Sequence, residues 1–128
     1  MEEHHIKKEY IALVQGHTNY KNKKIISNIA RDRHNAKKMI IHPNGKESVS
    51  IFNTLKNYKD CSLIQVTILT GRKHQIRVQC ASLNHPILND PLYGGKKIDN
   101  TGLLLQSHHI QFNDVDITCP QEKRFIRK

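Results

Sequence analysis

Cysteine, aromatic residues and long apolar runs are scarce in this sequence of 128 residues. The cysteines, Cys61, Cys80 and Cys119, are odd in number, far apart and without a CxxC motif, which argues against a disulfide scaffold and a cysteine zinc site. No apolar run approaches the roughly 18 residues of a membrane span, and the polar start MEEHHIKKEY is not a signal peptide. We expect a single domain, residues 1–128, in the cytosol or inside an organelle, and predict a cytoplasmic location with no membrane partner.

Histidine is plentiful, but its spacing does not predict a metal site. The nine histidines include the adjacent pairs His4–His5 and His108–His109, and no HxxxH or HExxH motif occurs. Zinc sites need three or four converging nitrogen or sulfur ligands. We predict no metal and no cofactor, and a metalloprotein is the weaker alternative. A chelator separates the two, because only a metalloprotein should lose folding or function with it.

Positive charge is abundant and unevenly distributed, with a net charge of +10. Residues 21–38 contain seven basic side chains and one acid, Asp32. Such a patch attracts polyanions and is the usual footprint of nucleic-acid binding, although a lysine-rich genome is an alternative explanation. We interpret residues 16–38 as a long polar excursion with a short helical turn near residues 25–30. Its basic residues are Lys21, Lys23, Lys24, Arg31, Arg33, Lys37 and Lys38.

The apolar pattern elsewhere predicts mostly strands. Residues 6–14 alternate as a strand, and residues 38–55 read as a short strand, a Pro-Asn-Gly turn and a second strand. Residues 62–70 alternate as well and are expected to form a hairpin with the preceding strand. Residues 103–112 and 115–118 read as a final hairpin. This pattern predicts an α+β fold on a mixed, mainly antiparallel sheet with one or two helices.

One helix is expected after the strand that ends near residue 70. Ile76, Cys80 and Leu83 recur at helical spacing, and Pro86 limits the helix soon afterwards. We therefore predict a helix that begins between residues 70 and 75.

The turn before this helix carries the basic stretch GRKHQIRVQ, residues 71–79. Glycine lets the backbone approach a ligand closely, and a helix start gathers free N–H groups. Arg72 and Lys73, with His74 beside them, suit phosphate oxygens. Arg77 stands between apolar neighbours, so it should be partly buried and need an anionic partner. The alternative is a solvated turn that happens to be basic.

The run LTGRKHQIRVQCASLNHPILNDPLYGG resembles the TGRxHQIRxH and GHPIxGDxxYG motifs of the RluA-type pseudouridine synthases. KKEYIALVQG is similar to the family's KxYxAxVxG strand, and KKMIIHPNGKES is similar to its KM-then-GK segment. LLLQSHHIQF lies where the family has a leucine-rich strand followed by His-Ala. The resemblance covers about residues 7–120, and the departures from it are Asn89, Gln79 and the pair Gln106–Ser107.

The resemblance implies an enzyme that isomerises uridine to pseudouridine in structured rRNA or tRNA, without cofactor or metal. The base is detached, rotated and rejoined through carbon, after the nucleotide has left its stack. By resemblance, Tyr10 lies against the flipped base, Arg77 pairs with the catalytic aspartate, and Leu104 or Leu105 belongs to the apolar wall of the pocket. An ordinary strand tyrosine is the alternative for Tyr10. We expect RNA contacts from the basic residues between 21 and 38 and from Arg72, Lys73 and His74.

The nucleophile of the family is an aspartate in an HRLDxxTSG motif, which does not occur in this sequence. Asp32 stands in the wrong order beside Arg33 and His34, and Asp90 matches the GDxxYG loop, where we expect a structural turn residue. The chain therefore resembles the C-terminal half of the catalytic domain, and we expect it to be inactive alone, with Arg77 lacking a fixed anion. Three alternatives stay open: a separate N-terminal half, a truncated or split gene, and a non-catalytic RNA-binding module. An unpaired strand edge could also lead to self-association.

Overall fold

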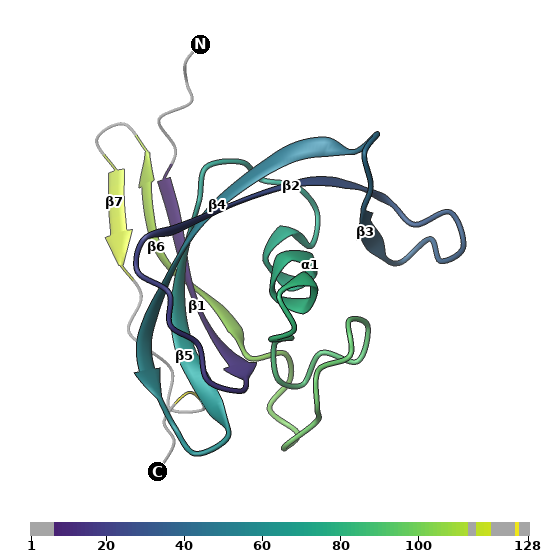
Figure 1. The fold of residues 1–128 in the computed structure, drawn as a ribbon. Coiled ribbons are helices and arrows are strands. Elements are labelled where there is room, and N and C mark those ends of the chain that lie inside the picture. The colour runs from purple at the N-terminus through teal and green to yellow at the C-terminus, as the bar shows by residue number, and fades with distance from the viewer. Residues whose placement is uncertain (1–6, 113–114, 119–124, 126–128) are drawn as a thin grey trace.

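The computed structural model describes residues 7–112, 115–118 and 125, which form one antiparallel sheet and one helix (Figure 1). The strands are β1 (Lys7–Gln15), β2 (Lys23–Arg31), β3 (Met39–Ile41), β4 (Lys46–Asn57), β5 (Cys61–Ile68), β6 (Leu105–Phe112) and β7 (Val115–Thr118), and the helix is α1 (Gln75–Ser82). The strand order is β3-β2-β4-β5-β1-β6-β7. Every pairing among the described strands is antiparallel. The α+β prediction is confirmed, and the described part of the sheet contains no parallel pair.

The two predicted hairpins are present. β4 pairs with β5, with Phe52 opposite Val66, and β6 pairs with β7, with Phe112 opposite Val115. The helix begins at Gln75, at the limit of the predicted interval, and Ile76 and Cys80 are buried as their spacing indicated. The spacing of four between Ile76 and Cys80 fits one face of a helix, and the alternation over residues 64–68 fits a strand.

Residues 23–31 form β2, so the predicted helical turn near residues 25–30 is wrong. The strand pairs with β4 on one side and with β3 on the other. Ile25 and Ile29 point into the core, whereas Ile26 is 55% exposed on the opposite face. Isoleucine is β-branched and packs well on a pleated surface, and two partner strands supply the backbone hydrogen bonds. Residues 23–31 of the predicted excursion are therefore part of the sheet.

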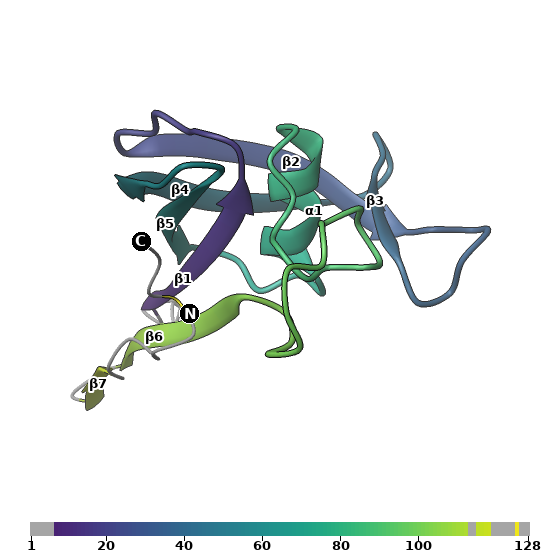
Figure 2. The ribbon, with the colours of Figure 1, turned by 90° about the horizontal axis from the view of Figure 1, so that it is seen from below.

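The sheet curves around α1. Figure 1 shows β2 and β4 arching over the helix, and the view from below in Figure 2 shows the helix against the same face of the sheet. The core between these layers contains Phe52, Val66, Ile76 and Cys80, all at most 5% exposed. Burying a large apolar side chain stabilises a fold by about 1.5–3 kcal/mol, so this contact holds the helix in place. Burial also raises the pKa of the Cys80 thiol, which leaves it a small core residue.

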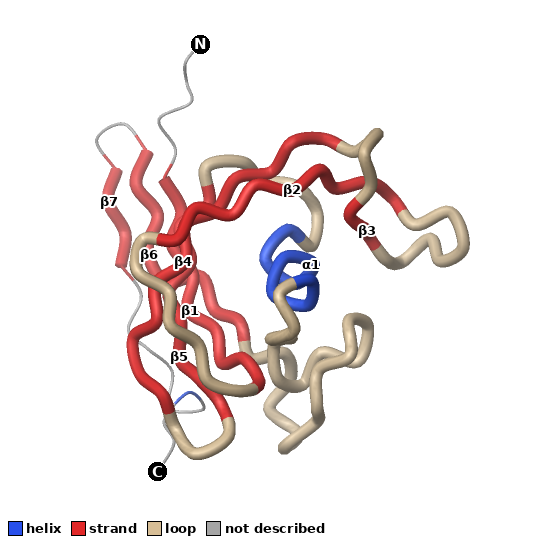
Figure 3. Tube along the Cα trace, viewed as in Figure 1, coloured by secondary structure: helices blue, strands red, loops and turns tan. Residues whose placement is uncertain are grey.

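The segment between α1 and β6, coloured as loop in Figure 3, runs back along the C-terminal half of β1. Leu88 N–H donates to the Leu13 carbonyl, and Leu13 N–H donates to the Leu104 carbonyl. Asn89 has a φ of 64°, the left-handed region that asparagine tolerates better than most residues. This conformation explains why asparagine can stand where the RluA-type motif has glycine. The segment thereby carries the DPLYGG loop to the helix.

The described residues include no helix that is long and apolar enough to cross a membrane. Within the same part of the chain, no three His, Cys, Asp or Glu side chains gather as ligands for a metal ion. His4–His5 and Cys119 lie outside the described residues. His109 is 3.6 Å from the carboxylate of Glu9. Cys61 and Cys80 are both buried.

Candidate active site

A pocket of about 290 Å³ opens between β1, the start of α1 and the chain that enters β6. It brings Tyr10 and Arg77 together, as the sequence predicted. Leu105 belongs to its wall, but Leu104 is fully buried in the core and Leu103 takes its place at the pocket. The remaining lining residues are Ile68, Arg72, His74, Gln75 and Ile76. The roles of Tyr10 and Arg77 in a reaction stay predictions.

Arg77 forms a two-pronged ion pair with Asp90. Its Nε lies 2.9 Å from Asp90 Oδ2, and its Nη2 lies 2.7 Å from Oδ1. The side chains are 19% and 0% exposed, respectively. These hydrogen bonds raise the pKa of Arg77 although burial acts to lower it. The expectation that Arg77 has no fixed anion is therefore wrong, because a partly buried guanidinium finds its anion in the DPLYGG loop.

Asp90 is a structural residue, as its place in the motif indicated. Besides the two hydrogen bonds from Arg77, its Oδ1 accepts the backbone N–H groups of Leu92 and Tyr93, at 3.2 and 3.3 Å. The carboxylate is fully buried and occupied on both oxygens. Asp90 is consequently unsuited to act as a nucleophile.

Tyr93, which the sequence reading did not single out, joins the site to the β3 edge. Its hydroxyl accepts the Met39 N–H at 2.8 Å and lies 2.8 Å from His74 Nδ1. Its ring lies 5.1 Å from the Arg77 guanidinium and 5.5 Å from Lys38 Nζ, within the range of cation–π contact. Burial raises the pKa of Tyr93. The feature of the sequence that pointed to Tyr93 was its position in the DPLYGG motif.

A buried amide holds the turn that precedes α1. Gln75 donates to the Val49 carbonyl at 3.1 Å and to the Ser50 hydroxyl at 2.8 Å. Its Oε1 accepts from the Thr70 hydroxyl at 2.8 Å and from the Arg72 N–H at 3.1 Å. The Ser50 hydroxyl in turn donates to Gln79, which is fully buried where the family motif has histidine. This network fixes the basic turn against β4.

Gln75→Ala should lower the free energy of unfolding by about 2–3 kcal/mol, because it leaves several buried groups without partners. Urea denaturation followed by circular dichroism measures the loss. Gln65→Ala is the matched control, since Gln65 is half-buried and donates one hydrogen bond, to Glu9. Equal losses of unfolding free energy in the two variants would contradict the conclusion that the hydrogen bonds of Gln75 stabilise the turn.

A basic groove of about 490 Å³ lies beside the pocket. It brings Arg31 of β2 together with Arg72 and Lys73 of the turn, two clusters that are far apart in sequence. Lys46, at the start of β4, also lines the groove and was missed because it stands alone among uncharged and acidic neighbours. Arg72 lines both groove and pocket, and its Nε donates to the Glu47 carbonyl at 3.0 Å. The remaining groove residues are Ile29, Ala30, Met39, Asn44, Gly45 and Gly71.

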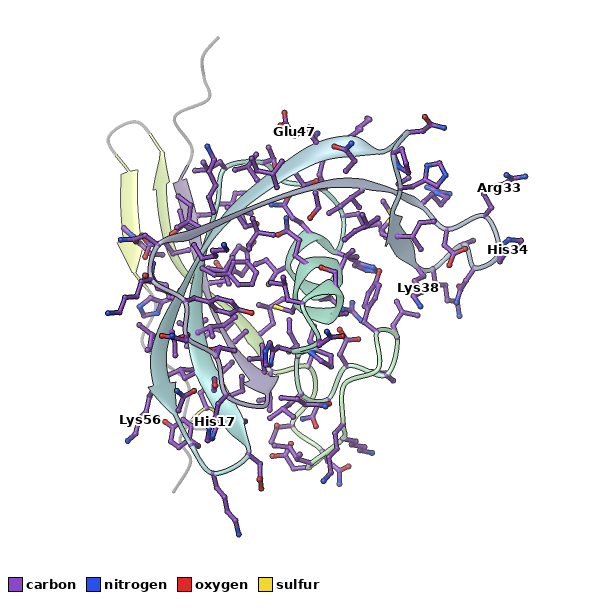
Figure 4. All side chains as sticks on the ribbon, in the orientation of Figure 1. His17, Arg33, His34, Lys38, Glu47 and Lys56 are labelled. Carbon is purple, nitrogen blue, oxygen red and sulfur yellow. The ribbon has the colours of Figure 1, made fainter. Side chains whose placement is uncertain are left out.

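The other predicted basic residues lie outside this groove. Figure 4 shows Arg33, His34 and Lys38 on the loop that projects between β2 and β3. Asp32, on the same loop, accepts the His34 N–H at 2.8 Å, as a turn residue does. Lys37 of this loop is exposed and does not line the groove. The same holds for the basic residues at the other end of β2, which are Lys21, Lys23 and Lys24.

The fold matches that of a pseudouridylate synthase domain. The solved structure "Human RNA Pseudouridylate Synthase Domain Containing 1" superposes with a TM-score of 0.82 at 26% identity, over 94% of this chain and 56% of that one. Residues 1–82 match the family model for RNA pseudouridylate synthase. The chain belongs to the RNA pseudouridylate synthase family.

Curated bacterial relatives agree with this assignment. The chain is 44% identical to the ribosomal large subunit pseudouridine synthase C of Buchnera aphidicola over 101 residues, 77% of this chain and 32% of the relative. It is 36% identical to the ribosomal large subunit pseudouridine synthase D of Borreliella burgdorferi over 124 residues, 93% of this chain and 36% of the relative. The chain thus spans about a third of the length of these relatives.

Proposed function

We propose that this chain is part of an enzyme that isomerises uridine to pseudouridine in ribosomal or transfer RNA. Its part is to bind the RNA backbone and the flipped base. The observation that supports it most is the position of Arg72, which lines both the basic groove and the pocket that contains Tyr10. The RNA backbone would follow the groove, with its phosphates near Arg31, Lys46 and Lys73. The flipped base would lie against Tyr10 between Leu103 and Leu105. The names of the two bacterial relatives favour ribosomal RNA.

Arg77 keeps donors for a second carboxylate. Asp90 engages Nε and Nη2 of the guanidinium. A guanidinium has five N–H donors, so both donors of Nη1 and one of Nη2 stay unused by Asp90. In this proposal Asp90 fixes the orientation of Arg77. The catalytic aspartate of the HRLDxxTSG motif then accepts hydrogen bonds from the N–H groups of Arg77 that Asp90 leaves unused. None of the residues that line the described pocket is itself a carboxylate.

The aspartate would come from another segment, either on a separate N-terminal half or in a longer form of the chain. Among the described strands, β3 and β7 are the edges of the sheet, and an edge strand can pair with an added strand. Self-association through such an edge is the competing event. We also propose a cytoplasmic location for the activity.

The RNA-binding part of the proposal predicts a salt-dependent affinity. Binding to a fluorescently labelled RNA hairpin should weaken as salt increases, with a log–log slope of about 0.7–0.9 per neutralised phosphate. Arg72→Ala should weaken binding and reduce the slope by about one such contact. Fluorescence anisotropy over a series of salt concentrations measures both.

Lys56→Ala is the matched control for Arg72→Ala. Lys56 lies near the C-terminal end of β4 (Figure 4), whereas Lys46 begins that strand, and Lys56 is not among the residues that line the groove. Removing this charge should leave the affinity nearly unchanged. An affinity that does not change with salt concentration would contradict binding in the groove. An equal loss of affinity in Arg72→Ala and Lys56→Ala would contradict it as well. Addition of a chelator should change nothing, which separates RNA binding from a metal-dependent function.

A further inference from the structure

His74 has an unusual backbone conformation at the pocket. It precedes α1 with φ 57° and ψ 22°, in the left-handed region that residues other than glycine seldom adopt. Its side chain forms no capping hydrogen bond with the helix. Such a conformation persists where the surroundings hold it, often at functional sites. At this position the imidazole lines the pocket next to Arg72 and Arg77.

The contacts of Tyr93 favour one of the two tautomers of the His74 imidazole. The Tyr93 hydroxyl accepts the Met39 N–H at 2.8 Å, so its own proton is available to His74 Nδ1, also at 2.8 Å. The two rings meet edge to face, with centroids 5.6 Å apart and an interplanar angle of 85°. This arrangement favours the tautomer in which Nδ1 accepts from the Tyr93 hydroxyl and Nε2 carries the N–H of the neutral ring.

The surroundings favour the neutral imidazole. Burial lowers the pKa of His74, and the positive charges of Arg77 and Lys73 lower it further, while Asp90 acts in the opposite direction. Within the described part of the chain, Nε2 has no hydrogen-bond partner, so its N–H is free to meet a ligand in the pocket.

We propose that His74 donates this Nε2–H to a carbonyl oxygen of the uracil in the pocket and thereby selects uracil over cytosine. The inference rests on the proposed function, because it assumes that the pocket receives a base. Uracil presents a carbonyl oxygen at the position where cytosine presents an amino group, so a fixed donor would face another donor in cytosine. A neutral N–H suits a neutral carbonyl, whereas Arg72 suits a phosphate and Arg77 suits a carboxylate. Ile68, Leu103 and Leu105 give the same pocket an aliphatic wall, and a hydrogen bond beside apolar side chains is stronger than one in water.

The tautomer can be measured without any RNA. Nitrogen-15 NMR of the histidine-labelled chain should show His74 protonated at Nε2 and unprotonated at Nδ1. Tyr93→Phe keeps the ring but removes the hydroxyl, so it should raise the share of the Nδ1–H form. A wild-type His74 protonated mainly at Nδ1 would overturn the proposal.

The base preference can be measured with two RNA heptamers that differ only in a central uridine or cytidine. The chain should bind the uridine heptamer about tenfold more tightly, the usual effect of one mismatched polar contact. His74→Asn should abolish this preference, since asparagine tolerates the left-handed conformation but its amide reaches only the Nδ1 position. His74→Gln, whose amide nitrogen reaches the Nε2 position, should restore part of it. Urea denaturation verifies that each variant is folded.

The outcomes separate this inference from the function on which it rests. If the wild-type chain binds neither heptamer, the proposed function fails, and the NMR result still decides the tautomer. If it binds but His74→Asn keeps the preference, the selection by His74 is refuted. An equal loss of affinity for both heptamers in His74→Asn would place His74 on the phosphate instead and would also refute it.

Discussion

Uridine-containing ribosomal or transfer RNA incubated with these 128 residues alone should contain no pseudouridine. Isomerisation requires a carboxylate at the sugar of the flipped nucleotide, and no Asp or Glu lines the pocket in the described part of the chain. Asp90, the carboxylate bound to Arg77, is fully buried and accepts four hydrogen bonds. Mass spectrometry of nucleosides after complete nuclease digestion measures the product.

Adding a polypeptide that carries HRLDxxTSG should produce pseudouridine in the same assay. The matched control is that polypeptide with its motif aspartate replaced by asparagine, which should bind equally and yield no product. Turnover by the 128 residues alone would overturn the assignment of a missing nucleophile. Absence of turnover with a bound partner would favour the non-catalytic RNA-binding module.

Asp90→Ala should lower the free energy of unfolding by about 2–4 kcal/mol. Removing one member of a buried ion pair leaves the other charge without compensation, and the partial exposure of Arg77 moderates that cost. The substitution also removes the acceptor of the Leu92 and Tyr93 N–H groups, so the loop that carries Tyr93 should loosen. Urea denaturation measures the loss.

Asp60→Ala is the control for this variant, because Asp60 is an exposed residue of the turn between β4 and β5. A surface substitution of this kind should change stability by less than about 0.5 kcal/mol. Arg77→Lys keeps the charge but cannot make the two-pronged contact with Asp90. Its loss of stability should therefore lie between the losses of Asp90→Ala and Asp60→Ala. A loss in Asp90→Ala as small as that in Asp60→Ala would mean that the ion pair does not hold the loop.

The strands with a clear alternation were predictable, and β2 was not. Burial alternates over residues 48–53 of β4 and 64–68 of β5, and a stretch of this kind identifies a strand without knowledge of its partners. In β2 the isoleucines stand at 25, 26 and 29, a spacing that suits a helical face as well as a strand. Its conformation depends on hydrogen bonds with β3 and β4, which local sequence does not encode.

The site was predictable where a motif named the residue. The resemblance placed Tyr10 and Arg77 at one pocket although they belong to β1 and α1. The pairing of Arg77 with Asp90 was missed, because it depends on how the loop after α1 folds back along β1. Gln75 and Tyr93 were missed because a neutral side chain gains its importance from hydrogen bonds that only the folded chain displays.

The position of β1 in the sheet has a consequence for how the molecule reaches its native state. β1 pairs with residues 61–68 on one side and with residues 105–111 on the other, so it must wait for partners that follow much later in the chain. Its segment from Ile11 to Val14 is at most 2% exposed once folded. Long-range pairing of this kind slows folding, and the apolar strand stays exposed to intermolecular contacts in the meantime. Refolding yield should therefore fall steeply with protein concentration, and chaperones that shield apolar strands should restore it.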